Sequence, residues 1–279
     1  MRPLHTLMVC LLTVAPGCAR GPAYELQGQI LAVDRARQEL TIKHGDIKGF
    51  MPGMTMAFRV KDAQLMDGRT PGDLVTATLV VESDTAYLSS VRVTGHAPLT
   101  EPAPAPRVDL LAPGAAVAPI RFTDEAGVAR TLTDWRGRVV VVTFVYTRCP
   151  LPDFCPRMDQ AFAALQQAVR ADPALANRVV LLSVSIDPEF DTPAVLAAHA
   201  RRVGAEPALW HFATGDRQAI ETFAAQFGVS VFHDASAGGA LTHNLRTAVI
   251  APDGSLAAVR PGSDWTAAML LEDVRRAGA

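Results

Sequence analysis

The sequence predicts two domains in succession, a small all-β barrel and then a layered α/β domain. With 279 residues, the chain is long enough for two compact domains, each with a hydrophobic core. Residues 25–95 alternate between apolar and polar side chains, whereas the residues beyond 114 switch between unbroken apolar runs and helical patterns. A proline-rich stretch separates the two patterns. The net charge of −2 gives no indication of a nucleic-acid partner.

The first 18 residues have the pattern of an export signal. Arg2 provides a positive start, an apolar run extends from Leu7 to Val14, and "APGC" ends at Cys18. The run is too short for a lasting transmembrane helix. The residues before Cys18 also resemble a lipobox, which implies lipidation of Cys18; a plain signal peptide with another cleavage site is the alternative. We therefore expect residues 1–18 to be a signal peptide of lipoprotein type. The mature protein is then exported, on the periplasmic side of a bacterial membrane, and anchored there by lipid.

Residues 19–96 are expected to form five strands. The alternating segments are residues 24–33, 38–44, 54–60, 73–81 and 86–93. Turn-forming residues such as "DGRTPGD" separate them, and five short strands joined by turns favour an OB-like barrel. Residues 97–113, "APLTEPAPAPRVDLLAP", are expected to be a Pro-rich linker with an extended, semi-rigid backbone.

Residues 114–279 are expected to alternate between strand and helix. The predicted strands are 138–146, 178–186 and 209–214, the helices are 156–171, 192–203 and 216–228, and a hairpin over 245–262 precedes a last helix over 264–277. Ser263 or Asp264 is the expected cap of that last helix. This order predicts a mostly parallel sheet with helices on both faces, which is a thioredoxin-like α/β arrangement.

Two cysteines are left in the folded part of the chain once the leader, with Cys10 and Cys18, is set aside. Cys149 and Cys155 could form a structural disulfide, a redox pair or a metal clamp. A bridge between them would close a small loop and stabilise the fold little, which counts against the first use.

The five residues between these cysteines are expected to form a loop, because residues six apart on a helix are separated by about 9 Å along its axis. Pro150 and Pro152 disfavour a helix there, and Pro156 suits a first helical turn. Cys155 would then lie at a helix N-terminus, where the helix dipole favours a thiolate. Two thiolates in a loop can converge on one ion, and soft thiolates select Cu(I) over hard metals.

A third ligand could come from "ALTHNLRTAVI", in which His243 stands just before a strand, although on spacing alone a solvated or core histidine is more common. Four segments, "FVYTRCPLPDFCPRM", "SVSIDPEFDTP", "WHFATGD" and "LTHNLRTAVIAPDG", together resemble the Sco/SenC family of copper proteins, from about residue 114 to the end. The resemblance implies a thioredoxin-like fold that holds one copper ion, Cu(I) or Cu(II), through Cys149, Cys155 and His243. It also implies a role in assembling the binuclear copper centre of cytochrome c oxidase.

Two features qualify this resemblance. The family usually has three residues between its cysteines, whereas this chain has five. Asp187 matches an acidic position near the family's copper site, but a strand-end cap explains it equally well. The implied partners are the copper-bearing subunit of cytochrome c oxidase or another copper acceptor, and a thiol reductant. A thiol–disulfide oxidoreductase and a periplasmic copper-resistance buffer stay open as alternatives, and the oxidoreductase does not need His243.

The segment "KHGDIKGFMPGMTMAF" contains His44, Met54 and Met56. The two methionines point to the same face of a strand, where they could fill the core or act as soft ligands outside the cytoplasm. The segment resembles the periplasmic CusF-type copper-binding domain, a five-stranded barrel whose ligands are one histidine and a Met-x-Met pair. The resemblance implies that these three residues bind Cu(I) or Ag(I).

In the CusF-type family a tryptophan caps the metal, but here Met51 stands at its place, beside Phe50. A third thioether ligand is therefore an alternative to the aromatic cap. Together, these patterns predict an exported copper chaperone with two copper sites, in which the barrel could capture Cu(I) and pass it to the second domain.

Overall fold

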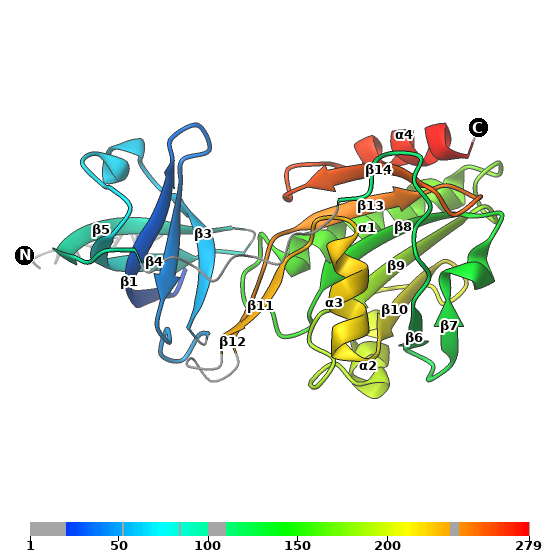
Figure 1. Ribbon diagram of the computed structural model, residues 1–279, viewed down its shortest axis with the longest axis horizontal. Helices are drawn as coiled ribbons and strands as arrows, with labels where there is room; N and C mark the ends of the chain where they lie inside the picture. The colour runs from blue at the N-terminus through cyan, green and yellow to red at the C-terminus, as the bar shows by residue number, and fades with distance from the viewer. Residues whose placement is uncertain (1–20, 52, 84, 100–109, 235–239, 279) are drawn as a thin grey trace, which may run out of the picture.

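The computed structural model describes residues 21–51, 53–83, 85–99, 110–234 and 240–278. The predicted signal peptide with Cys18, and most of the predicted linker, lie outside these residues. A β-barrel is followed along the chain by a larger α/β domain, and the two domains lie side by side (Figure 1). In the described part of the chain, no helix has the length and apolar character needed to cross a membrane.

The barrel consists of the five strands that the alternating pattern predicts. Their bounds are β1 Ala23–Asp34, β2 Glu39–His44, β3 Met54–Val60, β4 Asp73–Val81 and β5 Ala86–His96, with a short 3-10 helix η1 at Ala63–Met66. They close in the order β1-β2-β3-β5-β4. Alternate apolar residues such as Leu26, Ile42 and Leu88 point inward and are fully buried, so the barrel has a core of its own.

The barrel has a weak seam between β3 and β5. β3 pairs with β2 along its whole length, but its parallel pairing with β5 is recorded only at Arg59 with Tyr87 and at Val60 with Leu88. The pairing of β3 with β5 is therefore short, and β12 of the other domain also contacts β3. Cover from another part of the chain suits a sheet edge of this kind.

The α/β domain contains a seven-stranded sheet in the order β14-β13-β8-β9-β10-β6-β7. The strands are β6 Arg121–Asp124, β7 Ala129–Thr131, β8 Val139–Val145, β9 Val179–Ser185, β10 Trp210–Thr214, β13 Arg246–Ile250 and β14 Leu256–Pro261, with a 3-10 helix η2 at Leu132–Trp135. The helices are α1 Cys155–Ala171, α2 Pro193–Val203, α3 Arg217–Ala225 and α4 Ala267–Ala277. Strand β8 is apolar and buried throughout, as a central strand must be.

Helices cover both faces of this sheet, as predicted. Phe223 of α3 packs on Phe144 of β8, whereas Phe162 of α1 packs on Trp210 of β10. Helix α1 lies behind the sheet in Figure 1 and contacts α4, whereas α3 lies in front of the sheet. The sheet is nevertheless mixed rather than mostly parallel. Only β8, β9 and β10 are parallel, because each edge is completed by a hairpin, whose strands are antiparallel by construction.

A further hairpin reaches from the α/β domain to the barrel. It consists of β11 Val231–Asp234 and β12 Ala240–His243, and β12 lies alongside β3 (Figure 1). Neither of its strands is among those predicted from the sequence.

The expected cap of the last helix is also wrong. Thr266, rather than Ser263 or Asp264, accepts the hydrogen bond from the Met269 N–H at 3.3 Å. Asp264 instead pairs with Arg59 of the barrel at 2.9 Å. Asp264, which is a favourable capping residue, therefore makes an interdomain contact instead. The local sequence does not reveal this contact.

Candidate metal sites

The two cysteines lie where the central strand β8 passes into helix α1. β8 ends at Val145 and α1 begins at Cys155, so both sulfurs belong to one loop and its helical end. Cys149 is half-buried and Cys155 is buried, and both are free thiols. Their sulfur atoms are hydrogen-bonded to each other. The structure therefore brings the two predicted sulfur ligands together.

The proton shared by these thiols belongs to Cys155. The hydrogen bond from Cys155 lowers the pKa of Cys149, and donors from the Cys155 and Leu151 backbone and from the Tyr146 hydroxyl act in the same direction. Burial raises the pKa of Cys155 well above its ordinary value, and its bond to Cys149 raises it further. Burial thus opposes the effect expected from the helix dipole at Cys155, and Cys149 is the more acidic of the two thiols.

Tyr146 lies between the cysteines and His243. Its hydroxyl is hydrogen-bonded to Cys149, and its ring meets the His243 ring edge-on with the centroids 5.9 Å apart. Burial and the nearby Cys149 raise the pKa of Tyr146. Its hydroxyl therefore stays protonated and donates a hydrogen bond to the sulfur. Sequence reasoning missed this residue. Its only signal was its position three residues before Cys149.

His243 offers an uncharged imidazole at the end of β12. Its Nδ1 lies 3.1 Å from the carbonyl oxygen of Asn244, and because a carbonyl only accepts, the proton is on Nδ1 and the lone pair is on Nε2. Burial lowers the pKa of His243 to about 4. Within the described residues, no three His, Cys, Asp or Glu side chains gather into a metal-binding group. His243 and the thiols are thus linked through Tyr146 without forming a closed ligand set.

Asp187 forms an ion pair beside the cysteine loop. The Nε of Arg148 lies 2.6 Å from its Oδ2, and the guanidinium also lies 4.7 Å from the centre of the Phe190 ring. The Asp187 carbonyl accepts hydrogen bonds from the N–H groups of Phe190 and Asp191. These contacts agree with the strand-end role, and copper ligation by Asp187 stays a prediction.

In the barrel, His44 keeps a buried nitrogen without a hydrogen-bond partner. Its Nδ1 lies 2.7 Å from the Gly45 carbonyl oxygen, which places the proton on Nδ1. Its Nε2 is buried, and no partner for it is found among the described residues. His44 lies directly opposite Met54 in the β2–β3 ladder, and both are nearly inaccessible to solvent. An unpaired buried nitrogen is costly, but its lone pair beside a thioether suits a soft monovalent cation.

The loop before β3 is folded back over His44. The carboxylate of Asp46 accepts a hydrogen bond from the Gly53 N–H at 2.7 Å, and Ile47 and Met51 exchange backbone hydrogen bonds of 2.8 and 3.1 Å. A Cβ atom at Gly53 would lie 2.9 Å from the His44 carbonyl oxygen, so this close approach requires glycine. The loop thereby holds Met51 in the barrel core.

Phe50 and Met51, the two residues considered as caps of this site, have side chains in different surroundings. Phe50 stacks on Tyr24 with the ring centroids 4.4 Å apart, on the rim of the core. Met51 is 5% exposed and lies in the same buried cluster as Met54. This arrangement favours Met51 over an aromatic ring at the tryptophan's place. Its role as a ligand stays a prediction.

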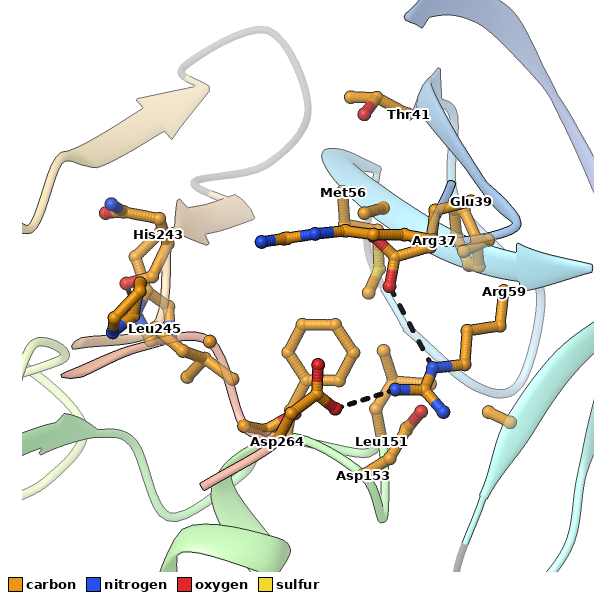
Figure 2. Close-up of a pocket in the computed structure, with 18 of the residues that line it drawn as sticks. Arg37, Glu39, Thr41, Met56, Arg59, Leu151, Asp153, His243, Leu245 and Asp264 are labelled. Carbon is orange, nitrogen blue, oxygen red and sulfur yellow. Dashed lines mark hydrogen bonds and ion pairs between the residues drawn. The ribbon is translucent and has the colours of Figure 1, made fainter. Parts of the chain in front are cut away.

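A cavity of about 620 Å³ lies between the two domains. Met56 of β3 and His243 of β12 both line it, and Figure 2 shows them on opposite sides. The ion pair between Arg59 and Asp264 closes one end of this space (Figure 2). The third predicted ligand of the barrel therefore faces the same space as the histidine of the α/β domain.

Residues 109–278, more than half of the chain, match the family model described as SCO1/SenC. The chain belongs to the SCO1/SenC family. Residues 23–93 of this SCO1/SenC protein also match the model described as copper binding periplasmic protein CusF, and they correspond to the barrel. Both predicted resemblances are therefore confirmed.

Relatives of this SCO1/SenC protein agree with its fold. It is 28% identical over 141 residues to the SCO1 protein homolog of Bacillus subtilis (strain 168), which covers 50% of this chain and 70% of the relative. It is similar to the crystal structure of a SCO1/SenC family lipoprotein from Bacillus anthracis str. Ames, with a TM-score of 0.54 and 24% identity, covering 61% of this chain and 99% of that one.

A structure of BsSco, described as a member of the Sco family of cytochrome c oxidase assembly proteins with a disulfide switch, is also similar. Its TM-score is 0.51 at 27% identity, covering 60% of this chain and 96% of that one. The predicted thioredoxin-like fold of the second domain is confirmed by these structures.

Proposed function

We propose that this protein is an exported copper chaperone with two copper sites. One site uses Cys149, Cys155 and His243, and the other binds Cu(I) or Ag(I) through His44, Met54 and Met56. The acceptor is the copper-bearing subunit of cytochrome c oxidase or a similar copper protein, as the family's link to oxidase assembly suggests. The observation that carries the proposal is the buried, unpaired Nε2 of His44 beside Met54 in a barrel fused to a SCO1/SenC domain.

The cysteine site has the donors that copper needs. Cys149 is the more acidic thiol, so one thiolate is ready to bind, and a metal would displace the proton of Cys155. The neutral ring of His243 supplies a third donor once it moves onto the sulfurs. Because Tyr146 touches both Cys149 and His243, it would guide this closure. The complete three-ligand site would then form only when copper binds.

The proposal is tested by counting bound copper in the full chain. We expect the reduced protein to bind two Cu(I) ions per chain under anaerobic competition with a Cu(I) chelator. The protein with a Cys149–Cys155 disulfide should bind only one, since a disulfide removes both thiolates and leaves the barrel intact. A reduced protein that binds one ion, and none after oxidation, would show that the methionines only fill the core.

The second candidate function is a thiol–disulfide oxidoreductase that keeps the cysteines of a partner reduced. The unequal thiols favour it, because a half-buried Cys149 with a lowered pKa can attack a disulfide while the buried Cys155 keeps its proton. The similarity to BsSco, described as having a disulfide switch, points the same way. Both functions require a reductant that restores the two thiols.

We further propose that the chain is held at the periplasmic face of a membrane by a lipidated Cys18. The motif before Cys18 supports this proposal. The intact mass of the detergent-extracted protein is expected to correspond to a chain that starts at Cys18 and carries acyl groups. Cys18→Ser should leave the protein unlipidated and free of the membrane fraction. A wild-type product that starts beyond Cys18 would contradict the anchor without affecting the copper sites.

A further inference from the structure

The loop between the two cysteines belongs partly to the barrel. Leu151 is 3% exposed and lies within the barrel's hydrophobic cluster, although it stands between the two cysteines of the other domain. Cys149 and Phe154 each pack against both hydrophobic cores. The loop is therefore docked in the barrel, and its docked part consists of residues 151–154.

The docking place is the seam of the barrel. β3 pairs with β5 at Arg59 and Val60, and the part of β3 that precedes them faces the cysteine loop and β12. Burial in the seam raises the pKa of the Asp153 carboxyl, whereas Arg59 of β3 and the backbone N–H of Ala86, the first residue of β5, act in the opposite direction. Leu151 thus fills the seam with apolar surface, and the Asp153 carboxyl lies near both of its sides.

The seam also separates the two sets of candidate copper ligands. His44 and Met54 lie deep in the barrel, whereas Met56 is only half-buried and lines the interdomain cavity. His243 lines the same cavity from the other side (Figure 2). Cys149 packs against the barrel cluster, while both thiols line a second cavity beside Tyr146. Met56, His243 and Cys149 therefore mark the two sides of the seam.

We propose that Cu(I) passes from the barrel to the cysteine site within one molecule, through this seam, with Met56 as the last barrel ligand to release it. Residues 151–154, docked in the barrel, fix the position of the cysteine site relative to the barrel site. This inference rests on the proposed copper function and adds the route between the sites. It also explains the five residues between the cysteines, since a shorter loop would have no Leu151 to place in the seam.

The transfer is a ligand exchange without a change of oxidation state. The Cys149 thiolate forms a bond to Cu(I) as the neutral Met56 thioether leaves. The Cys155 thiol then binds as a thiolate and gives its proton to water, and the His243 lone pair completes the new site. Copper stays Cu(I) throughout, so no oxidant or reductant is consumed. Thioethers are weaker donors than thiolates for Cu(I), which sets the direction of the exchange.

The route is tested with the full chain in its disulfide form, loaded with one equivalent of Cu(I) without oxygen. Excess phosphine reductant then frees the thiols, and the near-ultraviolet absorption of Cu(I)–thiolate bonds reports the arrival of copper. The methyl signals of isotope-labelled methionines report its departure. Thiol release is timed separately in the copper-free protein. In the wild type, copper is expected on the thiols without a lag after their release, at a rate independent of protein concentration.

Leu151→Asp places a charge in the seam and should undock the loop, because a buried carboxylate without a partner is strongly unfavourable. We expect a lag at least about tenfold longer than in the wild type, and one that shortens as protein concentration rises, since transfer then occurs between molecules. Leu151→Met keeps an apolar side chain of similar volume and should behave as the wild type. Asp153→Ala removes the attraction of the carboxylate to Arg59 and to the Ala86 N–H but keeps Leu151, so it should give a concentration-dependent lag that is shorter than that of Leu151→Asp.

The outcomes separate this inference from the proposed function. If both sites keep their Cu(I) affinities and Leu151→Asp transfers copper as fast as the wild type, the route through the seam is overturned. A wild-type lag that depends on protein concentration overturns it as well. If the wild type lacks one of the two affinities, the two-site function itself fails. Should Leu151→Asp not fold, Asp153→Ala decides the matter by the same measurement.

Discussion

Replacing His243 by alanine is expected to weaken Cu(I) binding at the cysteine site by at least about 100-fold, since losing even a residue that only supports a ligand costs about 10- to 100-fold. The variant leaves the two thiols in place, so disulfide formation and reduction should continue. The pKa of His243 is about 4 because the ring is buried, so its depressed pKa leaves the lone pair available above that pH. Its contribution to copper binding should be constant around neutral pH and should be lost only as the pH falls through about 4.

The measurement combines chelator competition for Cu(I) with the reduction potential of the dithiol. Cys149→Ser and Cys155→Ser should each abolish both properties, because each chemistry needs two sulfurs. His96→Ala is a matched control, since His96 is an exposed histidine at the end of β5 that pairs with Asp73 and is not among the candidate ligands. Unchanged Cu(I) affinity in His243→Ala would exclude the three-ligand site. A loss of disulfide exchange in the same variant would favour the oxidoreductase.

Replacing Met54 by leucine is expected to abolish tight Ag(I) or Cu(I) binding in the barrel while leaving its fold intact. Leucine has nearly the volume of methionine and no sulfur, so the cost in stability should stay below about 1.5 kcal/mol. The loss of a soft ligand should lower the affinity for Ag(I) by at least about 100-fold. The experiment is an Ag(I) titration of the full chain in its disulfide form, followed through labelled methionine methyl groups and thermal unfolding.

Met66→Leu is the control for this experiment. Met66 is 1% exposed and belongs to the same hydrophobic cluster, but it lies on η1, away from the β2–β3 ladder that holds His44 and Met54. The control variant should bind Ag(I) as the wild type does. If Met54→Leu also binds Ag(I) unchanged, the methionines serve only as core residues, and the unpaired Nε2 of His44 needs another explanation.

The local patterns of the sequence predicted the strands and helices that carry strong periodicity. The five barrel strands, the apolar β8 and the helix that begins at Cys155 were all expected from such patterns. The strands that were missed are β6, β7, β11 and β12, which have three or four residues each. Segments this short contain too few residues for an alternation to be recognised. The parallel character of the sheet was overestimated because pairing at the edges depends on those missed strands.

The candidate site was predicted in its residue types but not in its electrostatics. A local rule about helix ends favoured a thiolate at Cys155, but burial in the folded chain raises the pKa of that thiol and makes Cys149 the more acidic of the two. Tyr146 had only its nearness to Cys149 as a signal in the sequence, and Leu151 had none, because what they do depends on neighbours that are distant along the chain. Tyr146 meets a histidine 97 positions later, and Leu151 enters the core of the preceding domain.

The docked loop also determines how independent the two domains can be. An α/β domain produced alone would present Leu151 and Phe154 to water at the rim of its thiol site, because the barrel that covers them would be missing. A neighbouring pair of exposed apolar side chains beside a reactive sulfur favours self-association and disulfide-linked dimers. The barrel thus acts as a domain that shields these apolar side chains and the thiols from solvent. Because both domains belong to one chain, every α/β domain is synthesised with the barrel that covers it.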